Sequence, residues 1–202
     1  MWLYASTHDG EEALACQTHL ALLQHFPDLL TIIAPRHPAR RDDIAKIIRD
    51  HDLSYQLRGP EKNPPTHADQ VYIADTMGEL GLFYRLAPVA CIGRSFSNDG
   101  GGGHNPIEAA ILDCAVLHGP HVQNLERIYA EMAETGAAIA LDKPDALPAA
   151  LAGLLDSPEA LKNLQDLGYA FACRKTKILN SIIRELEPAF MLANLPVLKE
   201  TA

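Results

Sequence analysis

A short segment between two prolines carries the first side chain that could bind a charged ligand. Pro35-Arg36-His37-Pro38 follows an apolar run that ends at Ala34. The prolines restrict the backbone, so the guanidinium of Arg36 is held in a small region of space, where its planar fork can donate two hydrogen bonds to one phosphate. An arginine in such a segment can equally pair with a carboxylate of the same protein or remain solvated. Both interpretations of Arg36 stay open from this segment alone.

A second segment, from Asp75 to Leu80, follows another apolar run. Within it, Thr76 and Glu79 have the spacing of a capping box, which satisfies backbone N–H groups at the start of a helix. Capping does not explain Gly78, because a residue without a side chain lets another group approach the backbone closely. We therefore expect the backbone around Gly78 to contact a phosphate or a sugar, with helix capping as the alternative explanation of this segment.

Four consecutive glycines, Gly100–Gly103, precede a strong signal for the start of a helix. Asn105 is a suitable N-cap residue, Pro106 suits the first helical position, and Glu108 follows three residues after the cap. Ordering four glycines costs conformational entropy that a structural turn does not need, so we expect some other group to close over them. Glu108 could accept hydrogen bonds from ribose hydroxyls. The alternative is a well-formed helix start with a loose loop before it.

Other familiar chemical motifs are missing from the sequence. The glycine run lacks the Lys and Ser or Thr of a P-loop, and no G-x-G-x-x-G follows the first strand, so neither ATP hydrolysis nor NAD binding is indicated. His118 and His121 lack a matching carboxylate or cysteine, so we expect no metal site. No Gly-x-Ser-x-Gly elbow occurs and no cysteine has a nucleophile context, so covalent catalysis has no support. We expect no cofactor.

Short β-type runs alternate with helical segments along the chain, and these elements must position the three segments described above. Predicted strands cover Trp2–Ala5, Leu29–Ala34, Leu53–Leu57, Val71–Ala74, Val89–Ile92, Ala115–Leu117 and Ala137–Leu141, and predicted helices cover Glu11–His25, Arg41–Asp50, Gly78–Leu86, Pro106–Leu112 and Leu125–Thr135. The alternation predicts the α/β class, with one parallel sheet covered by helices on both faces. From Asp145 onward only helical periodicity remains, which predicts a helical C-terminal tail.

The segments of Arg36, Gly78 and Glu108 each lie between a predicted strand and the helix that follows it. In an open α/β sheet, ligands bind outside the C-terminal ends of the strands, where helix N-termini present unpaired N–H groups and partial positive charge. We therefore expect the three segments to meet at one rim of the sheet. There they would hold the phosphate and the sugar of a nucleotide.

Composition limits the partners of the chain. Its 202 residues include 17 Lys and Arg against 26 Asp and Glu, which gives a formal net charge of −9. This charge would repel a nucleic-acid backbone, so we expect no nucleic-acid partner. No apolar run reaches the roughly eighteen residues of a membrane-spanning helix, which predicts a soluble chain. Four separated cysteines fit a reducing compartment, and the abrupt start on a strand indicates a piece of a longer protein.

Six short segments occur in a fixed order between Trp2 and Leu141. They are Ala5-Ser6-Thr7-His8, Gly10-Glu11-Glu12, Pro35-Arg36-His37-Pro38, Asp75-Thr76-Met77-Gly78-Glu79-Leu80, His104-Asn105-Pro106-Ile107-Glu108 and Gly119-Pro120-His121. Together they resemble the C-terminal half of the 3-deoxy-D-manno-octulosonic acid (Kdo) transferases. The whole set is far more specific than any one of its members.

The resemblance implies a fold and a function. That family has the GT-B architecture, two Rossmann-like domains that face each other across a cleft, and it moves Kdo from CMP-Kdo to the lipid A precursor of lipopolysaccharide at the cytoplasmic face of the inner membrane. Residues 1–202 are then expected to form a single Rossmann-like donor domain, without the N-terminal acceptor domain. The acceptor lipid and the membrane would be contacted through that absent half.

The resemblance also implies which residues contact CMP. They are Pro35, Arg36, Met77, Gly78, Glu79, Asn105, Pro106, Ile107 and Glu108. The general base of the family is a glutamate of the N-terminal domain, so no catalytic residue is expected in this chain, and the chain alone is expected to be inactive. In the inverting reaction that base takes the proton of the attacking acceptor hydroxyl. Arg36 and the helix N-termini near Gly78 and Asn105 would stabilise the departing CMP.

The sequence departs from the family pattern at three places. Arg94 follows Gly93 where the family usually has a second glycine, Ala109 follows Glu108 where a proline is usual, and Phe96–Asp99 matches no family pattern. These departures affect the expected sugar contacts more than the nucleotide contacts. Two other functions stay open: a GT-B-like domain of a UDP-sugar transferase or 2-epimerase, and a non-catalytic module whose loops hold a protein or a small anion.

Overall fold

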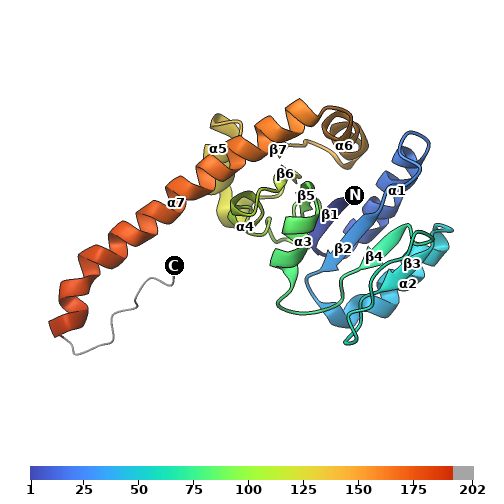
Figure 1. The fold of residues 1–202 in the computed structure, drawn as a ribbon, viewed down its shortest axis with the longest axis horizontal. Coiled ribbons are helices and arrows are strands. Elements are labelled where there is room, and N and C mark those ends of the chain that lie inside the picture. Colours follow the sequence, from blue (N-terminus) through green and yellow to red (C-terminus); the bar gives the residue numbers. More distant parts are fainter. Residues whose placement is uncertain (193–202) are drawn as a thin grey trace.

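One parallel sheet forms the centre of the molecule (Figure 1). The computed structural model describes residues 1–192, and from 178 onward it describes side chains only at 184–186 and 188. The sheet has the order β3-β4-β2-β1-β5-β6-β7, and every neighbouring pair is parallel. Its strands are β1 (Trp2–Thr7), β2 (Thr31–Pro35), β3 (Tyr55–Leu57), β4 (Val71–Ile73), β5 (Val89–Ile92), β6 (Ala115–His118) and β7 (Ile139–Ala140). The predicted α/β class with one parallel sheet is therefore confirmed.

Strand β1 lies in the middle of the sheet, where Leu3 pairs with Ile32 of β2 on one side and with Ala90 of β5 on the other. The chain first runs outward from β1 through β2 to β3 and β4, and it then returns to β5 on the opposite side of β1. This reversal creates a topological switch point at the C-terminal ends of β1 and β5. Open α/β sheets bind their ligands at such a point.

Helices cover both faces of the sheet (Figure 1). They are α1 (Glu11–Leu23), α2 (Arg41–Asp50), α3 (Leu80–Leu86), α4 (Ile107–Ile111), α5 (Glu126–Glu134), α6 (Leu147–Asp156) and α7 (Pro158–Leu192). Helices α1, α2 and α6 share one apolar cluster with the sheet, and α3, α4 and α5 share the cluster on the other face. Because both faces are buried, the strands are nearly continuous apolar runs, which is typical of parallel sheets.

Alternate residues of β1 supply the two clusters. Trp2 and Tyr4 belong to the cluster beneath α1, α2 and α6, whereas Leu3 and Ala5 belong to the opposite one, and all four side chains are fully buried. Successive side chains of a strand point to opposite faces, so the sequence of β1 fixes both clusters around one backbone. The loop that leaves β1 at the switch point is thereby attached to a fully buried strand that is paired on both sides.

The C-terminal part is helical, as the sequence predicts. Helix α7 starts against the body of the molecule and its far end extends beyond it (Figure 1). Among residues 1–192, no helix is both long enough and apolar enough to cross a membrane.

Three predicted helices begin later than expected, and one of them, α5, does so by a single residue at Glu126. Helix α3 begins at Leu80 and not at Gly78, because Gly78 has a left-handed φ of +77°, which cannot continue a right-handed helix. Helix α4 begins at Ile107 and not at Pro106, although Pro106 already has helical angles of φ −81° and ψ −16°. The differences at α4 and α5 are within the usual uncertainty of helix ends. The difference at α3 places the backbone of Gly78 in a loop.

Candidate functional site

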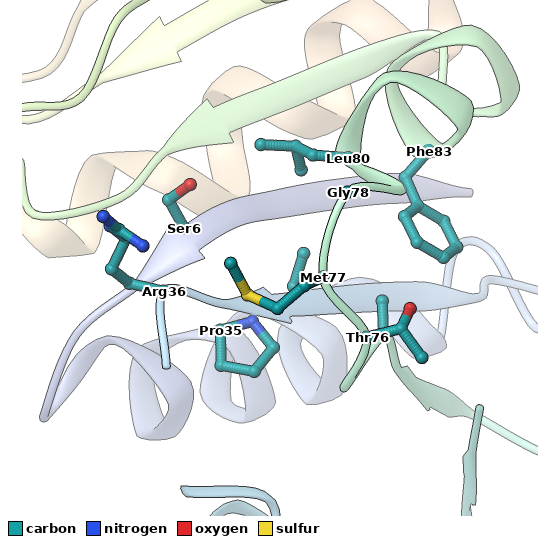
Figure 2. A pocket seen from close by; sticks show the side chains of 10 residues that line it. Ser6, Pro35, Arg36, Thr76, Met77, Gly78, Leu80 and Phe83 are labelled. Carbon is teal, nitrogen blue, oxygen red and sulfur yellow. The ribbon is translucent and has the colours of Figure 1, made fainter. Parts of the chain in front are cut away.

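The loops at the C-terminal ends of β1, β2 and β4 enclose a small cavity of about 100 Å³ (Figure 2). Pro35 and Arg36 line it from the end of β2, and Met77 and Gly78 line it from the loop after β4. Ser6 of β1 contributes to the same wall. Two of the three segments that the sequence singles out therefore meet beside the central strand.

The backbone after β4 is open to a ligand. Gly78 has a φ of +77°, and a Cβ placed on it would meet no atom within 4 Å. The neighbouring Met77 side chain is 71% exposed although it is apolar. An accessible backbone next to an exposed, polarisable thioether forms a surface on which a flat ring such as a nucleotide base can rest.

A second hollow of about 260 Å³ adjoins the first, because Gly78 and Leu80 line both. Glu108 lies on the wall of this second hollow and its side chain is exposed. Among the described side chains, none forms a hydrogen bond or an ion pair with Glu108, so its carboxylate is free to accept hydrogen bonds from a ligand. The structure thus places Arg36, Gly78 and Glu108 along one rim of the sheet.

The side chain of Asn105 bonds to the first turn of α4, although the helix begins one residue later than the sequence predicts. Asn105 Oδ1 accepts a hydrogen bond from the N–H of Ile107 at 3.0 Å. Pro106 is buried and Ile107 packs against the apolar cluster, so these residues fix the helix while Glu108 stays exposed. However, α4 has five residues and α3 has seven, so each helix sums only a few peptide dipoles. The helix N-termini near Gly78 and Asn105 are therefore weaker anion sites than expected from the sequence. Side chains must supply most of the positive charge of the site.

Glu79 is held by cations of this protein. Its carboxylate accepts hydrogen bonds from Arg58, with Nε–Oε2 at 2.7 Å and Nη2–Oε1 at 3.0 Å, and Lys62 Nζ lies 3.0 Å from Oε1. The hydrogen bonds from Arg58, and then those from Thr76 and Lys62, hold the pKa of Glu79 well below its usual range. Thr76 bonds to this carboxylate and not to a helix N–H, so the capping-box explanation of the pair is wrong. Glu79 instead ties the loop after β4 to the loop of Arg58.

Arg36 has no such partner. Its side chain is exposed, and among the described side chains it forms no ion pair with a carboxylate. Its neighbours differ, because Arg40 Nη1 lies 2.7 Å from Glu12 Oε1 and Arg41 Nη1 lies 3.5 Å from Asp75 Oδ2. The interpretation of Arg36 as one half of an internal salt bridge is therefore wrong. Its guanidinium is solvated at the edge of the cavity, where an incoming anion can reach it.

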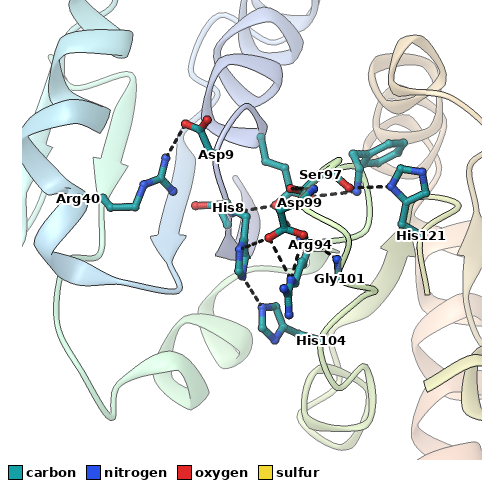
Figure 3. A network of polar contacts seen from close by, with 12 residues as sticks. His8, Asp9, Arg40, Arg94, Ser97, Asp99, Gly101, His104 and His121 are labelled. Atoms are coloured by element: carbon teal, nitrogen blue, oxygen red, sulfur yellow. Dashed lines mark hydrogen bonds and ion pairs between the residues drawn. The ribbon is translucent and has the colours of Figure 1, made fainter. Parts of the chain in front are cut away.

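A polar cluster that sequence reasoning missed lies at the switch point (Figure 3). His8 follows β1, and its Nδ1 is 3.0 Å from Asp99 Oδ2 while its Nε2 is 3.0 Å from His104 Nε2. Asp99 also accepts a hydrogen bond from Arg94 Nε at 3.1 Å. The signals in the sequence are that His8 and His104 belong to two of the six segments of the resemblance, and that Arg94 and Asp99 belong to the departures from the family pattern. None of them indicates that these four side chains contact one another.

Buried Glu11 fixes the two loops that carry this cluster. Its carboxylate accepts hydrogen bonds from the backbone N–H of His8 at 2.9 Å, of Arg94 at 2.8 Å and of Phe96 at 3.0 Å. Burial raises the pKa of Glu11, and these three N–H donors oppose that shift. Gly93 lets the two loops approach, since a Cβ there would lie 2.3 Å from the carbonyl oxygen of Ser6. The ends of β1 and β5 are therefore held together before any ligand arrives.

Both histidines of the cluster are poor bases. Burial is the main reason that the pKa of His8 is lowered, and Arg94 adds to the effect. Burial, followed by His8 and Arg36, lowers the pKa of His104 to about 4. Both rings are therefore neutral near pH 7. Since His8 Nδ1–H donates to Asp99, His8 Nε2 accepts from His104 Nε2–H, and His104 Nδ1 is left as an acceptor.

Three of the four glycines in the run Gly100–Gly103 pack closely against other groups of the protein. A Cβ on Gly101 would lie 1.9 Å from Arg94 Nε, one on Gly102 would lie 2.5 Å from the backbone nitrogen of Gln123, and one on Gly103 would lie 2.9 Å from the Tyr129 hydroxyl. These glycines therefore make room for neighbouring groups of the protein. Groups of the protein itself thus close over these three glycines, and a ligand is not required to account for them.

His121 links two loops, whereas His118 bonds within its own loop. His118 Nδ1 lies 2.7 Å from the carbonyl oxygen of Gly119, and His121 Nδ1 lies 2.7 Å from that of Ser97. Within the described part of the chain, no three His, Cys, Asp or Glu side chains are grouped so that they could hold a metal ion. The two histidines thus help to shape the loops after β5 and β6.

Comparison with known proteins places this geometry in a family. No family model matches the chain. A 3-deoxy-D-manno-octulosonic acid transferase of Haemophilus influenzae is 32% identical over 189 residues, which cover 93% of this chain and 44% of that protein. A probable mitochondrial 3-deoxy-D-manno-octulosonic acid transferase of Arabidopsis thaliana is 35% identical over 167 residues, which cover 82% of this chain and 37% of that protein.

A solved structure decides the assignment. The C-terminal CMP-Kdo binding domain of WaaA from Acinetobacter baumannii superposes with a TM-score of 0.79 at 30% identity, covering 84% of this chain and 87% of that domain. The chain belongs to the Kdo transferase family. The resemblance seen in the sequence is therefore confirmed, and so is the Rossmann-like fold of one half of a GT-B glycosyltransferase. The chain spans less than half the length of the Kdo transferases that it matches from Haemophilus and Arabidopsis.

Proposed function

We propose that this chain is the donor domain of a Kdo transferase and that its two adjoining hollows hold the CMP group of CMP-Kdo. The unpaired guanidinium of Arg36, beside the open backbone of Gly78 at the C-terminal rim of the sheet, carries this proposal. The matching Acinetobacter domain is described as CMP-Kdo binding, which supports it. Residues 1–202 then act as one domain of a longer two-domain enzyme.

Each side of the nucleotide has a chemically suitable group. Arg36 can donate two hydrogen bonds to the phosphate, and Pro35 restricts the backbone that carries it. The open backbone at Gly78 and the exposed side chain of Met77 suit the ring of the cytosine base. Glu108, which lines the second hollow, suits the ribose hydroxyls as a hydrogen-bond acceptor.

The remaining proposed site residues hold the loops and the helix start that carry the ligand contacts. Asn105, Pro106 and Ile107 set the start of α4, and so the place of the carboxylate that follows them. Glu79 contributes to the same site by holding the loop after β4 through its contacts with Arg58. Its own carboxylate is already paired, so we assign it no direct bond to the phosphate or the ribose.

In the complete enzyme this domain would bind and stabilise the leaving group, CMP. A base on the other domain takes the proton of an acceptor hydroxyl, the hydroxyl oxygen attacks the anomeric carbon of Kdo with inversion, and CMP departs with the electron pair of the broken C–O bond. Arg36 stabilises the negative charge that grows on CMP. We propose the lipid A precursor as acceptor, and the cytoplasmic face of the inner membrane as the place of work, reached through the other domain.

Binding of CMP by the 202-residue chain tests the proposal. We expect CMP to raise the thermal stability of the chain, since a ligand at a hundred times its dissociation constant adds about 2.7 kcal/mol. Arg36→Ala should weaken CMP binding by roughly tenfold or more, because a charge-assisted hydrogen bond contributes about 1.5 to 3 kcal/mol. Arg127→Ala is the matched control, since Arg127 is 92% exposed on α5 and lines neither hollow.

The outcomes separate the competing functions. Stabilisation by UDP and not by CMP would point to a UDP-sugar transferase or 2-epimerase, and the CMP-Kdo proposal would be wrong. No effect of either nucleotide would leave a module that holds an anion or a protein. If Arg36→Ala binds CMP as tightly as the unchanged chain, Arg36 does not hold the phosphate.

A further inference from the structure

The proposed CMP contacts do not use the polar cluster at the switch point. Arg94, Asp99, His8 and His104 are joined by hydrogen bonds and ion pairs between the ends of β1 and β5 (Figure 3). Both histidines are neutral near pH 7, so Arg94 carries the positive charge of the cluster and Asp99 its negative charge. Such a group of side chains beside a nucleotide site can recognise a second anionic part of the same ligand.

Arg94 presents a free edge of its guanidinium. Its Nε is the atom that contacts Asp99, at 3.2 Å from Oδ1 and 3.1 Å from Oδ2. Among the described side chains, none bonds to its two terminal nitrogens, and the side chain is 30% exposed. Asp99 is itself fixed, because its Oδ1 accepts the N–H of Gly101 at 2.9 Å. Arg94 is therefore anchored at one edge and open at the other, the arrangement that binds a carboxylate in bidentate fashion.

The backbone around Arg94 is adapted to this side chain. Arg94 has a φ of +60°, a left-handed conformation in which glycine is the favoured residue. Its guanidinium also occupies the place of a side chain at Gly101, where a Cβ would lie 1.9 Å from Nε. The left-handed backbone at Arg94 and the absence of a side chain at Gly101 together set the place of this guanidinium.

Arg94 lies near the proposed phosphate contact. The backbone N–H of Arg36 donates to the carbonyl oxygen of Thr7 at 3.1 Å, and the next residue, His8, joins the cluster. Arg36 and Arg94 both lie close enough to His104 to lower its pKa. The backbone N–H of His104 also donates to the carbonyl oxygen of Gly93 at 3.3 Å, and the rings of His37 and His8 have their centroids 6.0 Å apart. Arg36 and Arg94 therefore follow the two strands that flank β1, close to the contact between His8 and His104.

We propose that the free edge of Arg94 binds the carboxylate of the donor sugar, an inference that rests on the proposed CMP-Kdo function. Kdo is a 2-ulosonic acid, so only three covalent bonds separate the phosphorus of CMP-Kdo from the carboxylate carbon. A carboxylate site must therefore lie close to the phosphate site, and Arg94 and Arg36 follow the two strands on either side of β1. Asp99 acts as the positioning residue for Arg94. His104 Nδ1 is an acceptor in the neutral ring and can accept a hydrogen bond from a sugar hydroxyl.

The experiment compares two ligands of the 202-residue chain by NMR titration, namely CMP and freshly prepared CMP-Kdo. The measured quantity is the ratio of their dissociation constants, which isolates the sugar contribution. Arg94→Gln should reduce the preference for CMP-Kdo over CMP by about ten- to a hundredfold, because it removes a charge-assisted pair. Asp99→Asn should reduce it less, since Arg94 keeps its charge but loses its anchor.

Arg127→Gln is the matched control, because Arg127 also contacts a carboxylate through Nε, at 3.0 Å from Glu131 Oε1, but on the exposed face of α5. It should leave the ratio unchanged. If CMP binds and the ratio is the same in the unchanged chain and in Arg94→Gln, the carboxylate assignment fails while the proposed function stands. If neither ligand binds, the proposed function fails and this inference fails with it. An equal loss of CMP and CMP-Kdo binding in Arg94→Gln would also overturn the carboxylate assignment.

Discussion

At the scale of single residues, the hydrogen bond between His8 and His104 shows how the site controls protonation. One proton is shared between the two Nε2 atoms at 3.0 Å, and the aspartate on the far side sets which ring donates. Protonating His104 would place a third positive charge beside Arg36 and Arg94 in a half-buried position. The folded site therefore favours neutral rings, and the arginines carry the positive charge of the rim.

This protonation preference predicts a pH dependence of stability. The pKa of His104 falls from an ordinary 6.5 to about 4 in the folded chain. Between these values the unfolded chain binds more protons than the folded one, so the free energy of unfolding should decrease as the pH falls from about 6.5 to about 4. After allowance for solvent screening, we expect about 1 to 2 kcal/mol from this residue. Urea unfolding at pH 7.5 and at pH 5 measures the change.

His104→Gln provides the comparison for this pH effect. A glutamine at this position can still donate to His8 Nε2 but does not titrate. The loss of stability between pH 7.5 and pH 5 should be smaller in this variant than in the unchanged chain. Some loss will remain, because burial also lowers the pKa of His19 and of His118 in the folded chain. An identical loss in both chains would contradict the assigned pKa shift.

At the scale of elements, the close approach of β1 and β5 creates the switch point. Gly93 is the residue that permits it, because a Cβ there would lie 2.3 Å from Ser6 O and 2.6 Å from Ala5 O. Backbone atoms of the central strand cannot move aside without breaking its pairing with β2. The position therefore requires glycine for steric reasons, apart from any ligand.

We accordingly expect Gly93→Ala to lower the free energy of unfolding by about 3 kcal/mol or more, as for other overpacked core sites. The matched substitution is Gly153→Ala in the middle of α6, where a Cβ would meet nothing within 4 Å. It should raise the stability by up to about 1 kcal/mol, because alanine is the better helix former. Urea unfolding of both variants tests the pair, and equal effects would disprove the steric argument.

How far the sequence predicts the molecule depends on the range of the contacts. The parallel sheet, its covering helices and the helix start at Asn105 follow from local patterns of apolar residues and caps, and the structure confirms them. The pairing of Glu79 with Arg58, and that of Asp99 with His8 and Arg94, joins residues from different loops. Such contacts depend on which strands are neighbours. Periodicity along one chain does not contain that information.

At the scale of the whole molecule, α7 connects the two faces of the sheet. Leu164 belongs to the apolar cluster under α1, α2 and α6, whereas Phe171 and Ala172 belong to the opposite cluster. Lys175 adds an ion pair with Glu131 of α5. The first half of α7 thus closes the edge of the fold next to β6, while Leu186 lies on the part beyond the body and is 45% exposed.

The two halves of α7 should therefore contribute differently to the stability of the chain. Phe171 is 2% exposed, so Phe171→Ala removes a buried ring and should lower the free energy of unfolding by about 3 to 5 kcal/mol. Leu186→Ala on the same helix should change it by less than about 0.5 kcal/mol. Urea unfolding measures both changes in the free energy of unfolding, with the same dependence on urea concentration (m-value) required in the two variants. Similar losses in the two variants would show that the far half of α7 also packs, and that the stability of the donor domain depends on the whole helix.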